Sequence, residues 1–369
     1  MTTKTRRDKK DEQILERMRD LAQAVIDIFG EKGNPAVQIP LRSLSNSVYD
    51  EESRFIRMGD KLQERVFFHQ GQAKRFMQTF LVASACKELL DVRKTTSIRD
   101  LFYMTKHTLA RGENTFDDQS ESDPVLEDLE VTIGALREEL HLFASNKGTM
   151  VGNLTLVDSG DTIDCRSMGT GGYGIPSIVE EHVVQFKKCE ADFVLIMEKD
   201  AVWRRLNEDK FWKKHNCIMV QSGGQTSRGV RRLLRRLHEE KELPVYVLVD
   251  NDPWGLYIYS VLKYGSINLA FESERMAIPK ARFLGLSSFD REKFDLPSVV
   301  TIALNKNDEK RAREIMKYPW FNEKRWQKEL QKMMDSKVKL ELEALSSRGI
   351  SFISEKYLPE KIKNDDYLE

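Results

Sequence analysis

The stretch Asp192-Phe-Val-Leu-Ile-Met-Glu198 is a continuous apolar run that ends in a carboxylate. A second run, Pro244-Val-Tyr-Val-Leu-Val-Asp-Asn-Asp252, ends in two more. Such runs are typical of strands that are buried on both faces of a sheet. Between them lies Cys217-Ile-Met-Val220, followed by two glycines and an amphipathic stretch. This alternation of strand and helix predicts a mainly parallel sheet with right-handed crossovers.

Three carboxylates, Glu198, Asp250 and Asp252, follow these predicted strands. Ligands of open parallel sheets bind beyond the carboxyl ends of the strands, so we expect the three acids to converge there. Converging carboxylates repel one another unless a cation lies between them or their pKa values rise. Hard oxygen ligands suit Mg²⁺, which makes this edge a predicted magnesium site. For Asp252 alone, a helix cap before Pro253 is an equally good interpretation.

A second place where chemistry is expected is the helix predicted over 98–107, which Ser97 is suited to cap. Its apolar residues share one side, and Tyr103 lies away from them. Three potential cations are spaced to surround this tyrosine: Arg99, Lys106 and His107. Positive charge favours a phenolate and would stabilise charge on a phosphoryl group. Spacing alone makes Tyr103 a candidate nucleophile, although many half-exposed tyrosines have no role.

Five arginines lie in the helix predicted after Gly223-Gly224, on the side opposite its leucines. They are Arg228, Arg231, Arg232, Arg235 and Arg236. This face could contact DNA phosphates. A solvated face paired with Glu239 and Glu240 explains the pattern equally well.

Three domains are expected: an N-terminal extension (1–70), a helical module (71–147) and a domain around the predicted sheet (148–369) with a helical C-terminal elaboration. Helices predicted over 72–91, 97–108 and 124–144 fit a helix-turn-helix or winged-helix module, which would bind DNA. A helix is also predicted over 11–29, and a hairpin over 153–165 with its turn at a glycine.

The composition limits the function classes. The 369 residues include 59 basic and 59 acidic ones, so DNA binding would need a local basic patch. No apolar run approaches the roughly 20 residues that span a bilayer, and the basic N-terminus lacks a signal core. Four scattered cysteines suggest a reducing, intracellular location. The glycine-rich stretch 169–174 lacks a P-loop ending, so no nucleotide-binding residues are predicted.

Four segments carry a family resemblance. Glu198 in Met-Glu-Lys-Asp-Ala, and the pair Asp250-Asn-Asp252, resemble the signature of a Toprim domain, a metal-binding module of topoisomerases, primases and some nucleases. The segments 223–232 and 249–255, with Ser-Ile-Arg-Asp-Leu-Phe-Tyr103, are similar to the family of DNA topoisomerase VI A subunits and the related meiotic proteins that make double-strand breaks.

The resemblance implies an α/β multidomain protein with a winged-helix (CAP-like) domain and a Toprim domain. It implies that Tyr103 attacks double-stranded DNA with the help of Mg²⁺, forming a 5′-phosphotyrosyl link in a transient double-strand break, while Arg99 stabilises the transition state. It further implies a homodimer that joins an ATP-binding B subunit in an A2B2 heterotetramer. This holoenzyme would relax supercoils by ATP-dependent duplex passage, in the cytoplasm and at the nucleoid of an archaeon.

Two other classes remain open at this point. The chain could be a break-making recombination protein or a Toprim nuclease without strand passage. The chain could instead be a non-catalytic DNA-binding protein, but such a protein would need neither Tyr103 nor the three acids.

Overall fold

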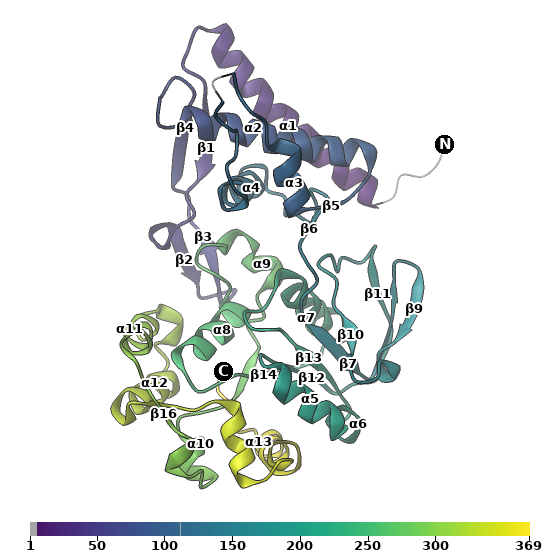
Figure 1. The fold of residues 1–369 in the computed structure, drawn as a ribbon, viewed down its shortest axis with the longest axis vertical. Helices are drawn as coiled ribbons and strands as arrows, with labels where there is room; N and C mark the ends of the chain where they lie inside the picture. Colours follow the sequence, from purple (N-terminus) through teal and green to yellow (C-terminus); the bar gives the residue numbers. More distant parts are fainter. Residues whose placement is uncertain (1–5, 111) are drawn as a thin grey trace. The chain divides into compact units, whose positions relative to one another are not determined.

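The computed structural model describes residues 6–110 and 112–369 (Figure 1). The chain divides into two compact units. Unit 1 comprises the residues up to Val48 together with Met58–Ser145, and unit 2 comprises Tyr49–Arg57 and Asn146–Glu369. Each unit is described by itself.

Unit 1 is mainly helical, and its core is formed by four helices. Residues from α1, α2, α3 and α4 pack together there, including Met18, Cys86, Phe102 and Leu129. Strand β1 pairs antiparallel with β4, and β5 pairs parallel with β6. The helices and strands of unit 1 are α1 (Arg6–Gly30), β1 (Ala36–Pro40), β4 (Leu62–Val66), α2 (Ala73–Val92), β5 (Thr96–Ser97), α3 (Ile98–Thr105), α4 (Gln119–Ile133) and β6 (Leu142–Phe143).

The predicted helices over 11–29 and 72–91 are confirmed as α1 and α2. The helix predicted over 97–108 is present as α3 but ends earlier, at Thr105, and the helix predicted over 124–144 is wrong at both ends. Helix α4 starts earlier, capped by the Asp118 side chain, and ends at Gly134 in the left-handed conformation (φ 62°). Leu136 and Leu140 continue the apolar spacing from an irregular segment, where both are buried.

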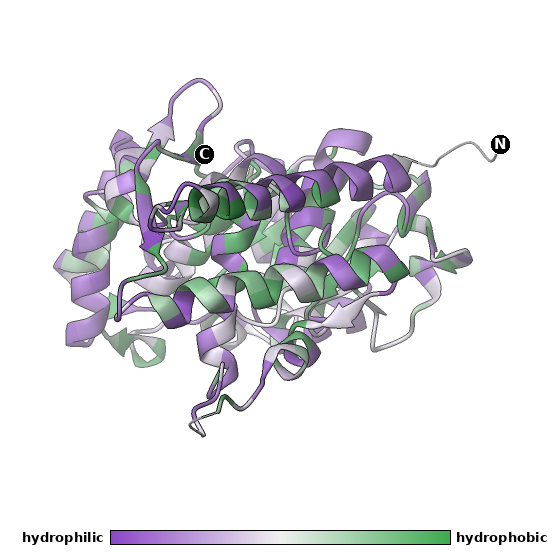
Figure 2. Ribbon diagram, turned by 90° about the horizontal axis from the view of Figure 1, so that it is seen from above, coloured by the Kyte–Doolittle hydropathy of each residue, from purple (hydrophilic) through white to green (hydrophobic). Residues whose placement is uncertain are grey.

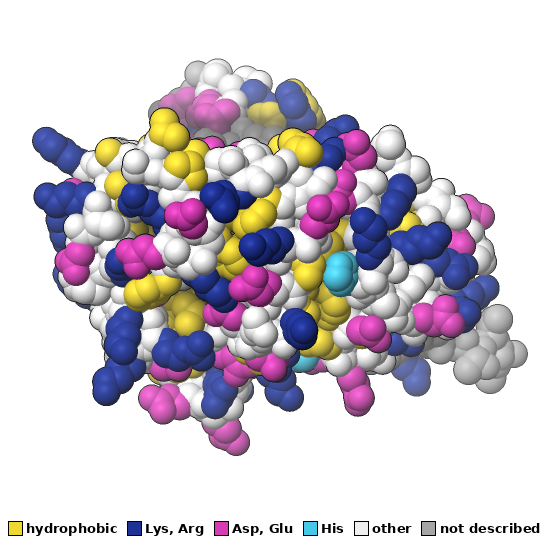
Figure 3. Space-filling view, turned by 90° about the horizontal axis from the view of Figure 1, so that it is seen from below, with side chains coloured by type: hydrophobic (Ala, Val, Ile, Leu, Met, Phe, Trp, Pro, Cys, Tyr) yellow, Lys and Arg dark blue, Asp and Glu magenta, His cyan; other side chains and the backbone are white. Residues whose placement is uncertain are grey.

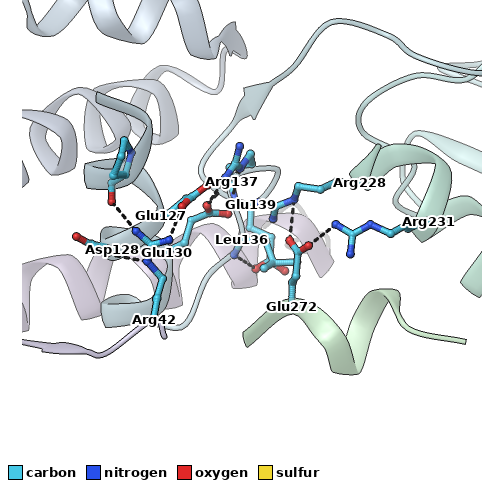
Figure 4. A network of polar contacts seen from close by, with 11 residues as sticks. Arg42, Glu127, Asp128, Glu130, Leu136, Arg137, Glu139, Arg228, Arg231 and Glu272 are labelled. Carbon is cyan, nitrogen blue, oxygen red and sulfur yellow. Dashed lines mark hydrogen bonds and ion pairs between the residues drawn. The ribbon is translucent and has the colours of Figure 1, made fainter. Parts of the chain in front are cut away.

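Charged side chains tie the β1–β4 pair of unit 1 to α4. The buried carboxylate of Asp128 in α4 accepts hydrogen bonds from Arg42, just after β1, and from Arg65 in β4. Arg42 also pairs with Glu127, and the buried Glu130 pairs with Arg137 at 2.8 Å (Figure 4). Buried charges of this kind are tolerated because each has a partner.

Unit 2 is built around a six-stranded sheet in the order β10-β7-β13-β12-β14-β15. Strands β13, β12, β14 and β15 are parallel. At one edge β7 pairs antiparallel with β13, and β10 pairs antiparallel with β7. The predicted parallel core is thus confirmed within a mixed sheet. Its strands are β7 (Thr149–Gly152), β10 (Tyr173–Gly174), β12 (Phe193–Met197), β13 (Cys217–Gln221), β14 (Val245–Leu248) and β15 (Arg282–Gly285).

Helices cover both faces of this sheet, which is why β12, β13 and β14 are buried along their whole length. The connections β12–β13 and β13–β14 run in opposite directions across the sheet, so right-handed crossovers place α5 and α7 on opposite faces. The helices of unit 2 are α5 (Asp200–Glu208), α6 (Phe211–Lys214), α7 (Arg228–Lys241), α8 (Pro253–Tyr264), α9 (Ser273–Met276), α10 (Asp290–Lys293), α11 (Lys306–Ile315), α12 (Lys324–Ser336) and α13 (Leu358–Lys363).

Smaller strands complete unit 2. The predicted hairpin is confirmed as β8 (Leu154–Asp158) and β9 (Asp161–Asp164), which turn at Ser159-Gly160 and extend to β11 (Val184–Cys189). Strand β16 (Ile302–Ala303) pairs with β17 (Val338–Lys339). The pair β2 (Ser47–Asp50) and β3 (Phe55–Met58) carries residues 49–57 of unit 2.

The surface is polar and mixed in charge. Helix α1, which follows the grey N-terminal trace in Figure 2, is largely hydrophilic with hydrophobic residues at intervals. On the face shown in Figure 3, basic and acidic side chains are interspersed, as the balanced composition leads one to expect. No helix within residues 6–110 and 112–369 combines the length and apolar character needed to cross a membrane.

Candidate active site

The parallel sheet brings the three predicted acids to one edge of unit 2. Glu198 directly follows β12, and Asp250 follows the adjacent β14 by two residues. Asp252 begins α8. Because β12 and β14 are parallel neighbours, their carboxyl ends lie side by side.

Asp250 is the most buried of the three acids, with 8% of its surface exposed. Its Oδ1 accepts a hydrogen bond from the backbone N–H of Leu342 at 2.8 Å. Its Oδ2 lies 2.9 Å from Nζ of Lys199, which also contacts Glu343 at 2.7 Å and Glu341 at 3.3 Å. Hence an ammonium group already compensates part of the negative charge here.

Asp252 caps α8. Its Oδ1 accepts the backbone N–H of Gly255 at 2.6 Å, and Pro253 occupies the first helical turn. The helix-cap interpretation of this residue is therefore confirmed. A cap uses one carboxylate oxygen for the helix, and a carboxylate has two.

Burial shifts the pKa values of all three acids in the same direction. Burial, followed by the charges of Asp250 and Asp252, raises the pKa of Glu198 to about 7. Burial also raises the pKa of Asp250 and of Asp252, despite the hydrogen bonds that each accepts. Burial is the largest cause for all three acids, and repulsion from the other acids of this set adds to it for Glu198 and Asp250.

Asn251, between the two aspartates, is fixed by contacts that the sequence did not reveal. Its side-chain amide donates to Ser288 Oγ at 3.0 Å and to Glu329 Oε1 at 3.1 Å. Its backbone exchanges hydrogen bonds with Leu340 at 2.9 and 3.1 Å. Glu329 is fully buried in α12, within the apolar stripe of Trp326 and Leu330, and a carboxylate in such a stripe is the signal that could have identified it.

The acids do not form a ready-made coordination sphere. In the part of the chain that the structure describes, no three histidine, cysteine or carboxylate side chains converge closely enough to hold one metal ion as they lie. The contact between Lys199 and Asp250 occupies one of the predicted ligand oxygens.

Tyr103 lies in unit 1 on α3 and is 60% exposed. A complete capping box starts this helix: Ser97 Oγ accepts from the backbone N–H of Asp100 at 3.0 Å, and Asp100 accepts in return from Ser97. Leu101 and Phe102 are buried, so the helix is anchored by its apolar side while Tyr103 and Arg99 are exposed. The ring of Tyr103 packs edge-on against Phe102.

The predicted arrangement of Lys106 and His107 is wrong in part. Helix α3 ends at Thr105, and Lys106 already has an extended backbone, so His107 does not lie one helical turn after Tyr103. Lys106 Nζ lies over the Phe102 ring and donates to the carbonyl of Asp117 at 3.2 Å. The backbone of His107 donates to Thr115 Oγ1.

The arginine helix α7 also differs from the expected free face. Arg231 and Arg236 are each 3% exposed. Arg231 and Arg228 pair with the buried Glu272 (Figure 4). Arg232 pairs with Glu180 at 2.9 Å. The remaining pairs join Arg235 to Glu239 and Arg236 to Glu240, as the alternative interpretation expected.

A mixed sheet with acids after two adjacent parallel strands, in a chain that also presents a tyrosine on a capped helix, defines a DNA-processing enzyme of the Toprim class. Models of known families agree. The model for the Toprim domain of Spo11 and of the topoisomerase 6 A subunit matches residues 193–362. "Type IIB DNA topoisomerase" matches 74–142, and "All-beta domain in DNA topoisomerase VI alpha subunit" matches 146–190.

The chain belongs to the family of type 2 DNA topoisomerase 6 A subunits. The relative of that name from Pyrococcus horikoshii is 41% identical over 367 residues, covering 97% of this chain and 96% of the relative. The relative from Hyperthermus butylicus is 43% identical and covers 91% of each chain. That from Methanocaldococcus jannaschii is 36% identical and covers 94% and 93%. The predicted family and enzyme class are thereby confirmed.

Proposed function

We propose that this chain is the DNA-cleaving and rejoining subunit of an ATP-dependent type IIB topoisomerase, with Tyr103 as its nucleophile. The observation that carries the assignment of Tyr103 is its exposure on a helix whose start is fixed by a capping box. A phenol held on a rigid element and open to solvent can reach a large substrate such as duplex DNA. Family membership supports the choice of DNA as that substrate.

The reaction is a transesterification. Tyr103 Oη forms a bond to phosphorus, the bond from phosphorus to the 3′ oxygen breaks, and the 3′ oxygen takes up a proton as the phenol loses one. The product is a 5′-phosphotyrosyl link and a free 3′ hydroxyl. Because one phosphoester replaces another, the reverse reaction rejoins the strand without a separate energy source.

Glu198, Asp250 and Asp252 would hold Mg²⁺. The donor set fits this ion, since all three are hard oxygen donors and their pKa values are raised as expected of acids that need a cation. When bound, the ion would polarise the phosphate and stabilise charge on the leaving oxygen. The fold itself would fix the positions of Asp250 and Asp252 relative to each other, through the contacts of Asn251 with Ser288 and Glu329.

Arg99 would stabilise the charge that develops on the phosphate in the transition state. It lies one helical turn before Tyr103 and is exposed on the same short helix. A guanidinium offers several donors in a plane, which suits two phosphate oxygens at once.

DNA binding by unit 1 would follow a winged-helix (CAP-like) plan. Helices α2, α3 and α4, the β5–β6 pair and an antiparallel bridge between Thr108 and Asn114 support this. We propose Lys106 and His107 as DNA contacts, with Arg228 and Arg232 in unit 2. Arg231 is better explained as a structural residue because it is buried against Glu272.

The assembly would be a homodimer, which cuts both strands with two tyrosines, joined to two ATP-binding B subunits. The duplex passage that relaxes supercoils would then depend on ATP hydrolysis in the B subunits. The names of the relatives, which describe one type of subunit, support a partner chain.

Cleavage of supercoiled DNA with the B-type subunit, ATP and Mg²⁺ tests the proposal. The wild-type chain should yield double-strand breaks with protein on the 5′ ends, and Tyr103→Phe should abolish the adduct because only the attacking oxygen is removed. Tyr367→Phe is the matched control and should behave as the wild type.

The alternative is a Toprim nuclease that uses activated water. Cleaved DNA with free 5′ phosphates, or breaks that persist in Tyr103→Phe, would establish that alternative. Covalent breaks without relaxation would instead indicate a break-making recombination protein.

A further inference from the structure

Lys199 is held by three carboxylates that differ in exposure. It follows Glu198 and precedes α5, where it is half-buried. Its Nζ lies 2.9 Å from Asp250 Oδ2, 2.7 Å from Glu343 Oε2 and 3.3 Å from Glu341 Oε2. The Asp250 side chain is 11% exposed, whereas those of Glu341 and Glu343 are 51% and 45% exposed.

The contact with Asp250 concerns one particular oxygen. Oδ1 of Asp250 is engaged by the backbone N–H of Leu342, so Oδ2 is the oxygen left to bind a cation. Lys199 contacts that same oxygen. A divalent cation and the ammonium group cannot both occupy it, since two cations in contact would repel each other strongly.

We propose that Lys199 is an internal counter-ion that must leave Asp250 before a divalent cation binds, and that Glu343, assisted by Glu341, holds Lys199 afterwards. This inference rests on the proposed metal site. Lys199 already contacts Glu343 at hydrogen-bond distance, so it needs only to lose one of its three contacts and not to move to a new location.

The charge balance favours replacement of Lys199 at Asp250 by a divalent cation over a permanent ion pair between Lys199 and Asp250. Lys199 contacts three carboxylates, and Glu198 is close enough to Asp250, Asp252 and Glu343 to interact electrostatically with them. One ammonium cannot neutralise them, which leaves the site attractive to a doubly charged ion.

The proposal gives Lys199 and Glu343 opposite effects on metal affinity. Removing the ammonium should tighten cation binding, because nothing then competes for Oδ2. Removing the Glu343 charge should weaken cation binding, because Lys199 then depends more on Asp250. If Glu343 were instead a direct metal ligand, its loss would weaken binding whether or not Lys199 is present.

Mn²⁺ binding to the full-length chain without DNA, measured from the electron paramagnetic resonance signal of free Mn²⁺, is the test. Mn²⁺ accepts the same oxygen ligands as Mg²⁺. Lys199→Met should lower the dissociation constant up to about fivefold, the order expected for loss of a competing, partly exposed ion pair. Glu343→Gln should weaken it by about threefold. The double variant should bind like Lys199→Met.

Controls make the outcomes separable. Lys188→Met removes a lysine paired with Glu190 at the surface of β11 and should leave Mn²⁺ binding unchanged. Lys199→Gln serves if Lys199→Met does not fold, and should also tighten binding. Unchanged or weaker binding in both Lys199 variants overturns the proposal, as does a Glu343 effect that persists without Lys199. Asp250→Asn tests the metal site itself, since wild-type affinity in that variant would refute the site and not only the role of Lys199.

Discussion

Lys263 is an unusual residue of α8, since only 4% of its surface is exposed. Its Nζ donates to the carbonyl of Ala281 at 2.8 Å and lies over the rings of Tyr259 and Tyr264. Burial lowers the pKa of Lys263 to about 8. The folded protein therefore binds this proton less tightly than the unfolded chain does, and the charged lysine destabilises the fold at neutral pH.

Lys263→Met should stabilise unit 2 by up to about 3 kcal/mol at pH 7, since a pKa unit corresponds to roughly 1.4 kcal/mol. The carbonyl of Ala281 keeps a partner, because Tyr259 Oη also donates to it. Below pH 8 both states of the wild type are protonated and the destabilisation is complete. Above pH 8 the folded state loses its proton first, so the wild type recovers stability up to about pH 10.

Urea unfolding of the wild type and of Lys263→Met at pH 7 and pH 10 measures this difference in stability. The advantage of Lys263→Met should shrink as the pH rises. An advantage of equal size at both values would show that packing, and not the buried charge, is responsible.

At the scale of elements, the position of α8 against the end of β14 depends on Gly255. A Cβ added there would lie 2.4 Å from the backbone oxygen of Asp250 and 3.3 Å from its backbone carbon and nitrogen. Backbone atoms cannot move aside as a flexible side chain can. The absence of a side chain at Gly255 thus lets α8 begin close to the backbone of Asp250, the acid that follows β14.

Gly255→Ala should lower the free energy of unfolding by about 2 kcal/mol, the usual order for overpacking, and should weaken Mn²⁺ binding because Asp250 is displaced. Gly174→Ala is the matched control. A Cβ at Gly174 meets no atom within 4 Å and its φ is not positive, so its unfolding free energy should stay within about 0.5 kcal/mol of the wild type. Urea denaturation followed by circular dichroism compares the two, and equal midpoints would contradict the packing argument.

Sequence patterns predicted the elements that rest on local information. The uninterrupted apolar runs identified β12 and β14, and their carboxyl ends located Glu198 and Asp250. The end of α4 was missed because Leu136 and Leu140 keep helical spacing and remain buried after the helix has stopped. Apolar residues at helical spacing therefore indicate which residues are buried, but they do not by themselves show where a helix ends.

Contacts between distant segments were beyond prediction. Arg231 and Arg236 were expected on a polar face of the helix. In the structure Arg231 pairs with Glu272, and Arg236 donates hydrogen bonds to the carbonyls of Val179 and Val184. Lys199 gave no indication that its partners would include Glu343, far along the chain. Such partners depend on the tertiary fold, which spacing along one helix does not encode.

At the scale of the whole molecule, unit 2 includes a segment from the N-terminal part of the sequence. Tyr49 packs edge-on against Tyr264 and also lies against Trp320, with ring centroids 5.8 Å apart in each case. Both partners belong to unit 2. The short segment 49–57 is therefore a structural part of a unit whose other residues start at Asn146.

Tyr49→Ala should destabilise unit 2, not unit 1, by about 1–2 kcal/mol, because it removes two aromatic contacts of a half-buried ring. Hydrogen exchange measured by mass spectrometry should show faster exchange in α8 and unchanged exchange in α2. Val48→Ala, at the exposed neighbouring residue, should change neither. Faster exchange confined to α2 would contradict the prediction, because it would show that Tyr49 stabilises unit 1 and not unit 2.

The same segment has a consequence for biosynthesis. On the ribosome, Tyr49 emerges early, and Trp320 emerges only near the end of translation. Unit 1 can collapse around its four helices while residues 49–57 loop out of it with their aromatic ring still lacking its partners. Folding of the Toprim part must then recruit a segment synthesised long before, which makes it a high-contact-order step that nascent-chain chaperones would protect.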